Sequence, residues 1–271
     1  MSLDVVIPTY DRLDYLFESL KSVLKQSVKI DVVYVIDDNS SYDLSDFNKA
    51  LDGIELNGIK VEYYRNEINQ GACFSRNRGA KLSKADYVAY LDDDDIWELN
   101  HLYNLLSLIE EDNVVLAYSG KKIRNFETGK ERCSYKKIPF ENQYQHLLKC
   151  NYPGSTSSII VKRIDMINCG GFDEVLSAIQ DYDLYLRLIK QGIFKSNSEA
   201  TMIYRNDTSL KITKQVNKGI ASANIILAKY SQRDKKNLNL TLTLQNFKKC
   251  IRHFQFRLMP LVLNSFLKNR K

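Results

Sequence analysis

The stretch that decides the fold is YVAYLDDDDIW, residues 87–97, where a short apolar run leads into Asp92–Asp95. The apolar run predicts a buried strand, and the four aspartates follow at its carboxyl end. One or two acids there would suit the start of a helix, and Asp95 is a candidate to cap the helix predicted after it. Four adjacent carboxylates repel one another, and a hard cation such as Mg²⁺ or Mn²⁺ offsets that repulsion. Because Mg²⁺ usually binds one or two carboxylates plus phosphates, the run predicts a metal that bridges the protein and a phosphate-bearing ligand.

Other strands end in the same way. Residues 30–40, IDVVYVIDDNS, are nearly continuous in β-branched residues, as in a strand buried on both faces, and end in Asp37 and Asp38. Residues 4–10, DVVIPTY, form a strand closed by Pro8, and residues 60–64 another. Helical spacing of apolar residues between them predicts an α/β fold with a doubly wound, mainly parallel sheet. Ligands bind outside the carboxyl ends of such strands, so three turns should form one polar crevice.

The later chain is less regular. Residues 121–153 are polar and Tyr-rich, which predicts loops and an edge hairpin, and residues 157–163 predict a further strand. Residues 180–192, QDYDLYLRLIKQG, predict a helix that begins near Asp181. This acid could cap the helix, or it could face the crevice as a general base, and the sequence leaves both readings open.

A glycine-containing segment, NQGACFSRNRG at residues 69–79, supplies Arg76 and Arg78. These arginines could belong to a solvated helix face or provide a cation near a diphosphate. The sequence has no GxxxxGK[ST] motif, which excludes a Walker-type phosphate loop.

Charge is concentrated at one end of the chain. The net charge is +6, yet residues 235–271 contain nine Lys or Arg and no Asp or Glu, so the rest carries +6 − 9 = −3. Apolar residues fall near one helical face of this tail, with Pro260 expected to interrupt the helix: Phe247, Ile251, Phe254, Leu258 and Leu261. The tail could pack on its own domain or a partner subunit, or lie on an anionic membrane surface. Nucleic acid is not expected, since no recognition motif accompanies the charge.

Composition indicates a globular protein of the cytoplasm. The chain has 271 residues, which suits one large domain or a domain with an extension. Its five cysteines are odd in number and lack CxxC spacing, as expected for reduced thiols, and the three histidines do not complete a zinc site. Neither a membrane-spanning segment nor a secretory signal is expected.

Six motifs together resemble family 2 glycosyltransferases of the GT-A fold, over residues 3–204. In order they are VVIPTYDR, VIDDNSS, NQGACFSRNRG, YLDDDDIW, GGFDE and QDYDLYLRL. The resemblance implies a GT-A domain at residues 1–205, with a nucleotide-binding half at 1–120 and an acceptor-side half at 121–205. A basic helical extension would occupy residues 206–271.

The resemblance also implies roles for individual residues. Asp94 looks like the principal metal ligand, with Asp92 beside it, and Asp181 matches the catalytic base. Many relatives have Glu before that base, whereas this chain has Gln180. The implied nucleotide-binding residues, with Asp38 against uracil, are Pro8, Thr9, Tyr10, Asp38, Arg76, Asp92 and Asp93.

The implied activity is a Mn²⁺- or Mg²⁺-dependent, inverting transfer of a sugar from a nucleotide sugar, with a UDP-sugar favoured. The acceptor would be a hydroxyl of a saccharide, such as a lipid-linked one in bacterial surface-polysaccharide synthesis, at the inner face of the cytoplasmic membrane. The alternative is a catalytically silent subunit that binds nucleotide sugars, against which Asp94 and Asp181 argue. An aspartyl phosphatase would need DxDx[TV] where this chain has PTYDR, a receiver domain is much shorter, and a nucleotidyltransferase would need a glycine-rich loop.

Overall fold

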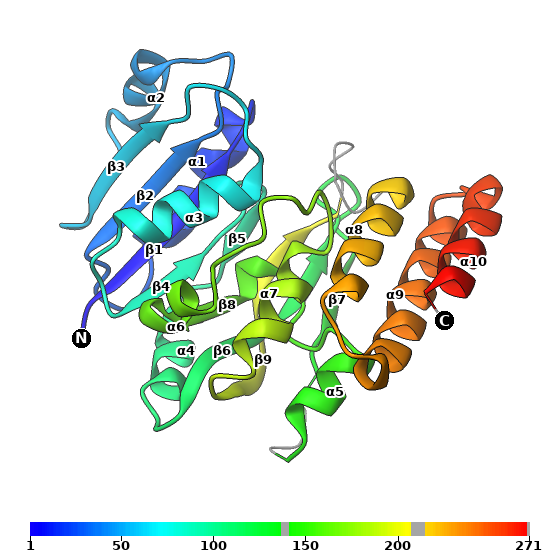
Figure 1. Cartoon of the computed structure of the whole chain (residues 1–271). Coiled ribbons are helices and arrows are strands. Elements are labelled where there is room, and N and C mark those ends of the chain that lie inside the picture. Colours follow the sequence, from blue (N-terminus) through cyan, green and yellow to red (C-terminus); the bar gives the residue numbers. More distant parts are fainter. Residues whose placement is uncertain (137–140, 207–214, 270–271) are drawn as a thin grey trace.

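A computed structural model describes residues 1–136, 141–206 and 215–269 (Figure 1). Its described strands form one sheet in the order β3-β2-β1-β4-β8-β6-β9-β5, with β7 paired to β6. The strands are β1 (Leu3–Thr9), β2 (Val32–Asp37), β3 (Lys60–Arg65), β4 (Tyr87–Tyr90), β5 (Asp95–Trp97), β6 (Val114–Arg124), β7 (Glu131–Ser134), β8 (Ile159–Lys162) and β9 (Ile193–Arg205).

The first half of the sheet is parallel, because β1 pairs in parallel with β2 and β4, and β2 with β3. In the second half β6 and β9 are parallel, while β8 runs antiparallel between β4 and β6. The predicted α/β fold is therefore confirmed, with mixed strand directions on the later side. The predicted edge hairpin is also confirmed, since β7 returns antiparallel along β6.

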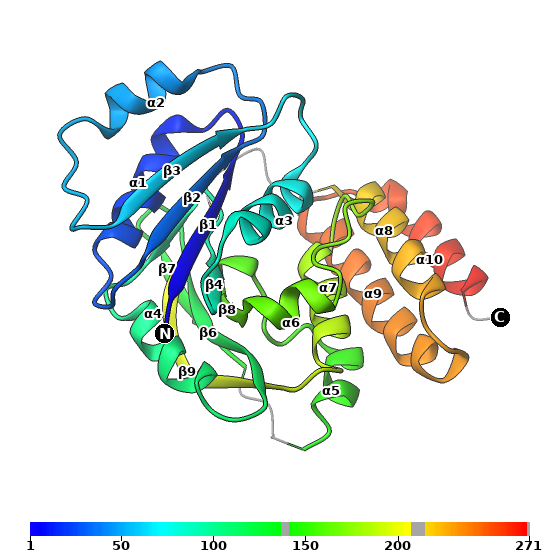
Figure 2. The ribbon, with the colours of Figure 1, turned by 60° about the vertical axis from the view of Figure 1, so that its left-hand side comes forward.

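Helices cover both faces of the sheet, as Figure 2 shows for β1 to β3. On one face Val5 packs in a cluster with α1 (Leu13–Leu24) and α4 (His101–Ile109). On the other face Val6 packs with α3 (Ala72–Leu82) and α7 (Gln180–Leu188). Successive side chains of a strand point to opposite faces, so burial of both faces explains the continuous apolar runs.

One glycine sets how closely α3 approaches the sheet. A Cβ added to Gly79 would lie 2.4 Å from Cγ1 of Val6 in β1. The bare backbone at this position lets α3 pack directly on β1. The start of α3 lies near the carboxyl end of β2, because the N–H of Gly71 donates to Asp38, directly after that strand.

The remaining helices of the first two hundred residues are short. They are α2 (Leu44–Leu51), α5 (Gln143–Lys149), the 3₁₀ turn η1 (Thr156–Ser158) and α6 (Arg163–Asn168). Of these, α5 lies where the sequence predicted only loops and a hairpin.

Three helices end the described chain: α8 (Val216–Ala228), α9 (Gln232–Arg252) and α10 (Met259–Lys268), with a 3₁₀ turn η3 (Phe256–Leu258) before α10. They lie side by side in Figure 1 and contact one another. The break between α9 and α10 comes before Pro260, which lies in the first turn of α10. Proline suits this position, because an N–H in the first turn has no hydrogen-bond partner within the helix. Apolar side chains of α8 and α9 join the cluster that contains α7: Ala223, Ile226, Leu227, Leu238 and Leu242. No helix in the described ranges is both long and apolar enough to cross a membrane.

Candidate functional site

The acid run forms a turn between two strands. β4 ends at Tyr90 and β5 begins at Asp95, so the expectation that Asp95 caps a helix is wrong. The next helix, α4, begins only at His101, with Asn100 before it. The hydroxyl of Ser19 donates to the carbonyl oxygens of Asp93 and Asp95, at 2.9 and 2.6 Å. These bonds from α1 fix the backbone of the turn.

Arginines contact the acids that the sequence assigned to a metal. One guanidinium nitrogen of Arg12 lies 3.2 Å from carboxylate oxygens of both Asp93 and Asp94. Asp93 also accepts a hydrogen bond of 2.9 Å from the hydroxyl of Thr9. Burial raises the pKa of Asp93 to about 7, although Arg12 opposes the rise. Part of the expected repulsion is therefore offset by the protein's own cation, which the sequence analysis did not assign.

The acid turn suits a metal that also binds phosphate. Among the described residues, no group of three or more His, Cys, Asp or Glu side chains is arranged to hold a metal ion. A site with one or two carboxylates is the usual protein share for Mg²⁺, whose other ligands are water and phosphate oxygens. The hard oxygen donors of Asp92 and Asp94 fit that pattern.

Arg76 joins the acid turn to the start of α7. It is buried in α3, with its guanidinium 5.3 Å from the centre of the Phe172 ring. One terminal nitrogen pairs with Asp92 at 2.5 Å, and the other donates to Oε1 of Gln180 at 3.2 Å. The neighbouring Arg78 donates instead to the side-chain oxygen of Asn66. Of the two predicted arginines, only Arg76 contacts an acid of the turn.

Asp181 is the second residue of α7, directly after Gln180. It makes no capping bond: Oδ1 accepts from the N–H of Tyr182 at 2.8 Å, and Oδ2 from the side-chain amide of Asn151 at 3.3 Å. Burial raises the pKa of Asp181, while Arg76 and Lys121 oppose the rise. A raised pKa makes a carboxylate a stronger base, which suits proton abstraction.

The backbone before Asp181 is strained. Ile179 has φ of 54° in the left-handed region, which is unusual for a β-branched residue. Asp183, the other acid of this segment, is fully buried and paired with Arg187 at 2.8 Å and Lys229 at 2.7 Å. Asp183 is thus a structural ion-pair residue, whereas Asp181 makes no ion pair among the described residues.

The predicted nucleotide side lies at the ends of β1 and β2. Pro8 and Thr9 end β1, and the exposed Tyr10 follows them. Asp38 is buried and accepts hydrogen bonds from the side chain of Asn66 and from the N–H groups of Gln70 and Gly71, at 2.7 to 2.9 Å.

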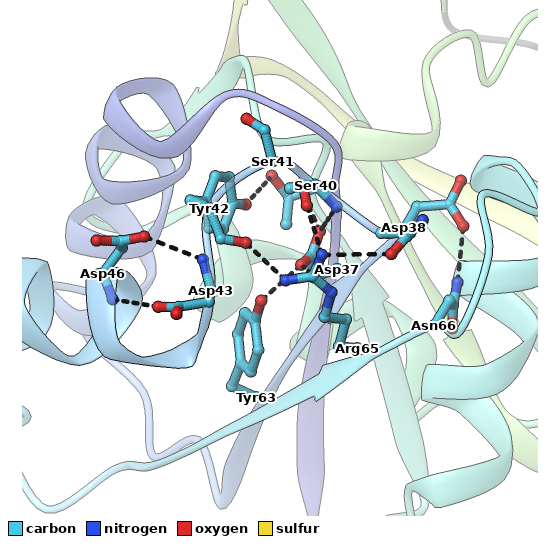
Figure 3. A network of polar contacts seen from close by, with 12 residues as sticks. Asp37, Asp38, Ser40, Ser41, Tyr42, Asp43, Asp46, Tyr63, Arg65 and Asn66 are labelled. Carbon is cyan, nitrogen blue, oxygen red and sulfur yellow. Dashed lines mark hydrogen bonds and ion pairs between the residues drawn. The ribbon is translucent and has the colours of Figure 1, made fainter.

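Figure 3 shows Asp38 with Asn66 and, beside them, the contacts that shape the turn after β2. Asp37 accepts bonds from the N–H and hydroxyl of Ser40 and from the hydroxyl of Tyr63. The pair Asp37 and Asp38 therefore holds together the turn after β2, the end of β3 and the segment before α3.

Several site residues gave no local signal in the sequence. Asn151 contacts Asp181, and the hydroxyl of Ser157 accepts the N–H of Asp92 at 3.0 Å across 65 residues. Arg12 lies in the motif PTYDR, at the carboxyl end of the first predicted strand. This place in the sequence was the signal that could have predicted a cation beside the acids.

A cavity of about 590 Å³ lies elsewhere, between α3, α6 and residues 169–175. Its walls include Asn77, Met166, Cys169, Phe172 and Lys229. None of the predicted site residues lines it, so it is separate from the acid turn.

Comparison with known proteins points to one family. A family model described as "Glycosyl transferase family 2" matches residues 4–170. The amylovoran biosynthesis glycosyltransferase AmsB of Erwinia amylovora is 31% identical over 71% of this chain, and the match spans slightly less than two thirds, 65%, of that relative. WfaP of Escherichia coli, named as a UDP-Glc:alpha-D-GlcNAc-diphosphoundecaprenol beta-1,3-glucosyltransferase, is 27% identical over 74% of this chain and 76% of its own length.

Solved structures show the same fold. TarS of S. aureus, residues 1–349 in complex with UDP-GlcNAc, superimposes with a TM-score of 0.75. The alignment covers 100% of this chain and 82% of that one, at 17% identity. The arrangement of sheet and helices, including the C-terminal helices, therefore recurs in a protein of dissimilar sequence.

Proposed function

Because the chain belongs to glycosyl transferase family 2, we propose that it transfers a sugar from a nucleotide sugar to a hydroxyl of a saccharide acceptor. The observation that carries the proposal is the bridge made by Arg76. One side chain contacts both Asp92 in the acid turn and Gln180, the neighbour of Asp181. A donor held at the turn and a base at the start of α7 would then serve one reaction centre.

A UDP-sugar is the proposed donor. TarS is solved with UDP-GlcNAc, and WfaP is named for UDP-Glc, which supports a uridine nucleotide. The nucleotide base would lie near Pro8, Thr9 and Tyr10, with Asp38 at its edge. Asp38 accepts hydrogen bonds from Asn66 and Gly71, and we propose that it also contacts the nucleotide base.

A divalent metal, Mn²⁺ or Mg²⁺, would be held by Asp94 and Asp92 together with the donor diphosphate. When bound, such a metal neutralises charge that develops on the departing nucleoside diphosphate. Arg12 and Arg76 lie against the same acids and keep them oriented. Asp93, hydrogen-bonded to Thr9, would face the ribose side of the turn.

Asp181 would act as the base. The acceptor oxygen forms its bond to the anomeric carbon while the bond from that carbon to the diphosphate oxygen breaks. The hydroxyl proton passes to Asp181, where Asn151 holds Oδ2 in position. A single displacement of this kind inverts the anomeric centre.

Calorimetry of UDP binding, with Mn²⁺ and with EDTA, tests the donor and the metal. We expect tight binding only with the metal, and Asp94→Ala should abolish the difference. Equal affinity in EDTA, or tighter binding of GDP, would refute this part of the proposal. Mn²⁺-dependent hydrolysis of a UDP-sugar without acceptor separates an enzyme from a silent binding subunit.

We propose that the acceptor is a lipid-linked saccharide, reached by a cytoplasmic enzyme bound to the inner face of the membrane. The acceptor named for WfaP, a diphosphoundecaprenol-linked sugar, supports this choice. Around α10 the structure has exposed apolar side chains in an acid-free basic segment, a composition suited to anionic lipid: Phe254, Phe256, Leu261, Leu263 and Leu267.

Co-sedimentation with vesicles tests the membrane surface. The full chain should bind vesicles that contain phosphatidylglycerol and not neutral vesicles. Replacing both Phe254 and Phe256 by Ser should weaken that binding. If the double variant binds as the native chain does, the apolar surface has another partner.

A further inference from the structure

Asn77, on α3, holds the backbone of a residue that lies 95 positions later in the chain. Its side-chain oxygen accepts the N–H of Phe172, and its side-chain nitrogen donates to the carbonyl oxygen of Phe172, both at 2.8 Å. The same nitrogen donates to the carboxylate of Glu174 at 2.8 Å. One buried amide thus satisfies both backbone groups of Phe172, as a neighbouring strand would in a sheet.

The residue before Phe172 is suited to this contact. Gly171 has φ of 67° in the left-handed region, and a Cβ added there would lie 2.5 Å from Oδ1 of Asn77. A side chain at this position would push the amide away from Phe172. The cavity of about 590 Å³ lies against residues 169–175, so hydrogen bonds, those from Asn77 among them, take the place of packing on that side.

The ring of Phe172 contacts both Arg76 and the strand that leads to the acidic partner of Arg76. The guanidinium of Arg76 lies over the ring, 5.3 Å from its centre, which is within the range of a cation–π contact. The ring of Tyr90, the last residue of β4, meets the Phe172 ring edge-on, with 5.4 Å between the two centres. Tyr90 stands two residues before Asp92, with which Arg76 pairs.

The guanidinium of Arg76 is held by hydrogen bonds at one end only. Its terminal nitrogens bind Asp92 and Gln180, whereas its buried Nε makes no hydrogen bond among the described residues. Two bonds at one end leave the group free to tilt about the line that joins them, and the face of the Phe172 ring removes that freedom. The same segment also holds Gln180, whose amide nitrogen donates to the carbonyl oxygen of Leu176 at 2.8 Å.

We propose that Asn77 is a positioning residue for the transfer reaction, which acts by holding the Phe172 ring against Arg76. The inference rests on the proposed function, in which Arg76 links Asp92 of the acid turn to the start of α7. With the ring in place, the guanidinium keeps Asp92 in the orientation that the structure shows. Without the ring, the guanidinium tilts, and its bonds to Asp92 and Gln180 are weakened together.

The guanidinium itself reports on this role without any reaction. When both terminal nitrogens are bonded, rotation about the Nε–Cζ bond is slow, and ¹⁵N spectra at low temperature resolve the two nitrogens. The resonances lost in Arg76→Lys identify those of Arg76. Asn77→Ala and Phe172→Leu should merge or broaden these resonances, because each removes part of the support under the guanidinium.

Asn239→Ala is the matched control. Asn239 is also buried and donates to a backbone carbonyl oxygen, that of Phe266 at 3.0 Å, but it joins α9 to α10. Asn77→Ala and Asn239→Ala should both lower the Tm. Only Asn77→Ala should change the resonances of Arg76, which separates a positioning role from a general loss of stability.

Hydrolysis of a UDP-sugar with Mn²⁺ measures whether the effect passes through Arg76. Loss of one charge-assisted hydrogen bond should lower kcat/KM about tenfold or more in Arg76→Met, and Asn77→Ala should lower it by less. The double variant should be no slower than Arg76→Met alone, because Asn77 acts through Arg76. If Asn77 only stabilised the fold, the two losses would multiply.

Asn77→Asp takes the place of Asn77→Ala if the latter does not fold. It keeps the oxygen that accepts the N–H of Phe172 and loses the bonds that the amide nitrogen donates. Resonances of Arg76 that are merged already in the native chain or unchanged in the Asn77 variants, or losses that multiply, overturn the proposal. If the native chain hydrolyses no UDP-sugar, the proposed function fails, and the resonances still decide whether Asn77 holds Arg76.

Discussion

Replacing Arg12 by Gln should destabilise the metal-free protein, because it removes the cation between two largely buried acids. The guanidinium lies 3.2 Å from both Asp93 and Asp94, whose side chains are 8% and 11% exposed. Removing one partner of a buried ion pair costs roughly 3–5 kcal/mol. The side chain of Arg12 is itself 23% exposed, so water screens part of the charge, and we expect about 2–3 kcal/mol.

Thermal unfolding in EDTA measures this effect. A loss of about 2–3 kcal/mol should lower the Tm by roughly 4–10 °C in a protein of this size. The matched control is Arg124→Gln, which breaks an exposed pair with Glu131 whose side chains are 36% and 31% exposed. The control should cost about 1 kcal/mol or less. Equal losses in the two variants would refute the argument that burial of Asp93 and Asp94 makes Arg12 important.

The Arg12→Gln variant also tests whether the acids bind a metal. With Arg12 gone, Mn²⁺ is the remaining cation that could offset the acids, so Mn²⁺ should raise the Tm more in Arg12→Gln than in the native chain. If Mn²⁺ changes neither Tm, the acids do not hold a metal in the absence of donor.

Asp181→Asn should lower transfer by a factor on the order of 10² or more while UDP binding stays nearly intact, and transfer at the native rate would move the base elsewhere. Lys121→Met should shift the acid limb of the pH profile of kcat to higher pH. The base must be ionised, and burial raises its pKa, while Lys121 and Arg76 are cations that oppose this rise. An unchanged profile would contradict that coupling. Gly79→Ala should cost about 1–3 kcal/mol in urea unfolding, because its Cβ would meet Val6 at 2.4 Å, and a neutral effect would show that α3 moves freely.

The sequence predicted those parts of the fold that depend on local residue patterns. The strands before Asp38 and Asp92 are continuous apolar runs, and both faces of these strands are covered in the structure. The helix after Gln180 follows from apolar spacing, and the structure begins it at that residue. The acids at the strand ends also lie where parallel pairing puts them.

The parts that were missed depend on contacts between distant segments. β8 enters the sheet between β4 and β6 in the antiparallel direction, and no local pattern indicates a neighbour about seventy residues away. β5 has three residues and was read as a helix start because acids precede it. In the tail, the predicted single apolar face is divided: Phe247 and Leu258 pack around Val262, while Ile251, Phe254 and Leu261 are exposed. The packing of α10 back on α8 and α9 decides that division.

The shared core of α7, α8 and α9 has a consequence for how such enzymes can be recombined. Leu238 and Leu242 lie in the same apolar cluster as Leu184, which is three residues, or about one helical turn, after Asp181. A chimera that exchanged only the last helices would therefore need to match the side chains of α5 and α7 as well, or leave this cluster poorly filled. Helix α7, which carries Asp181, and the tail thus share one core, and an engineer who wishes to alter one must redesign the surface that joins them.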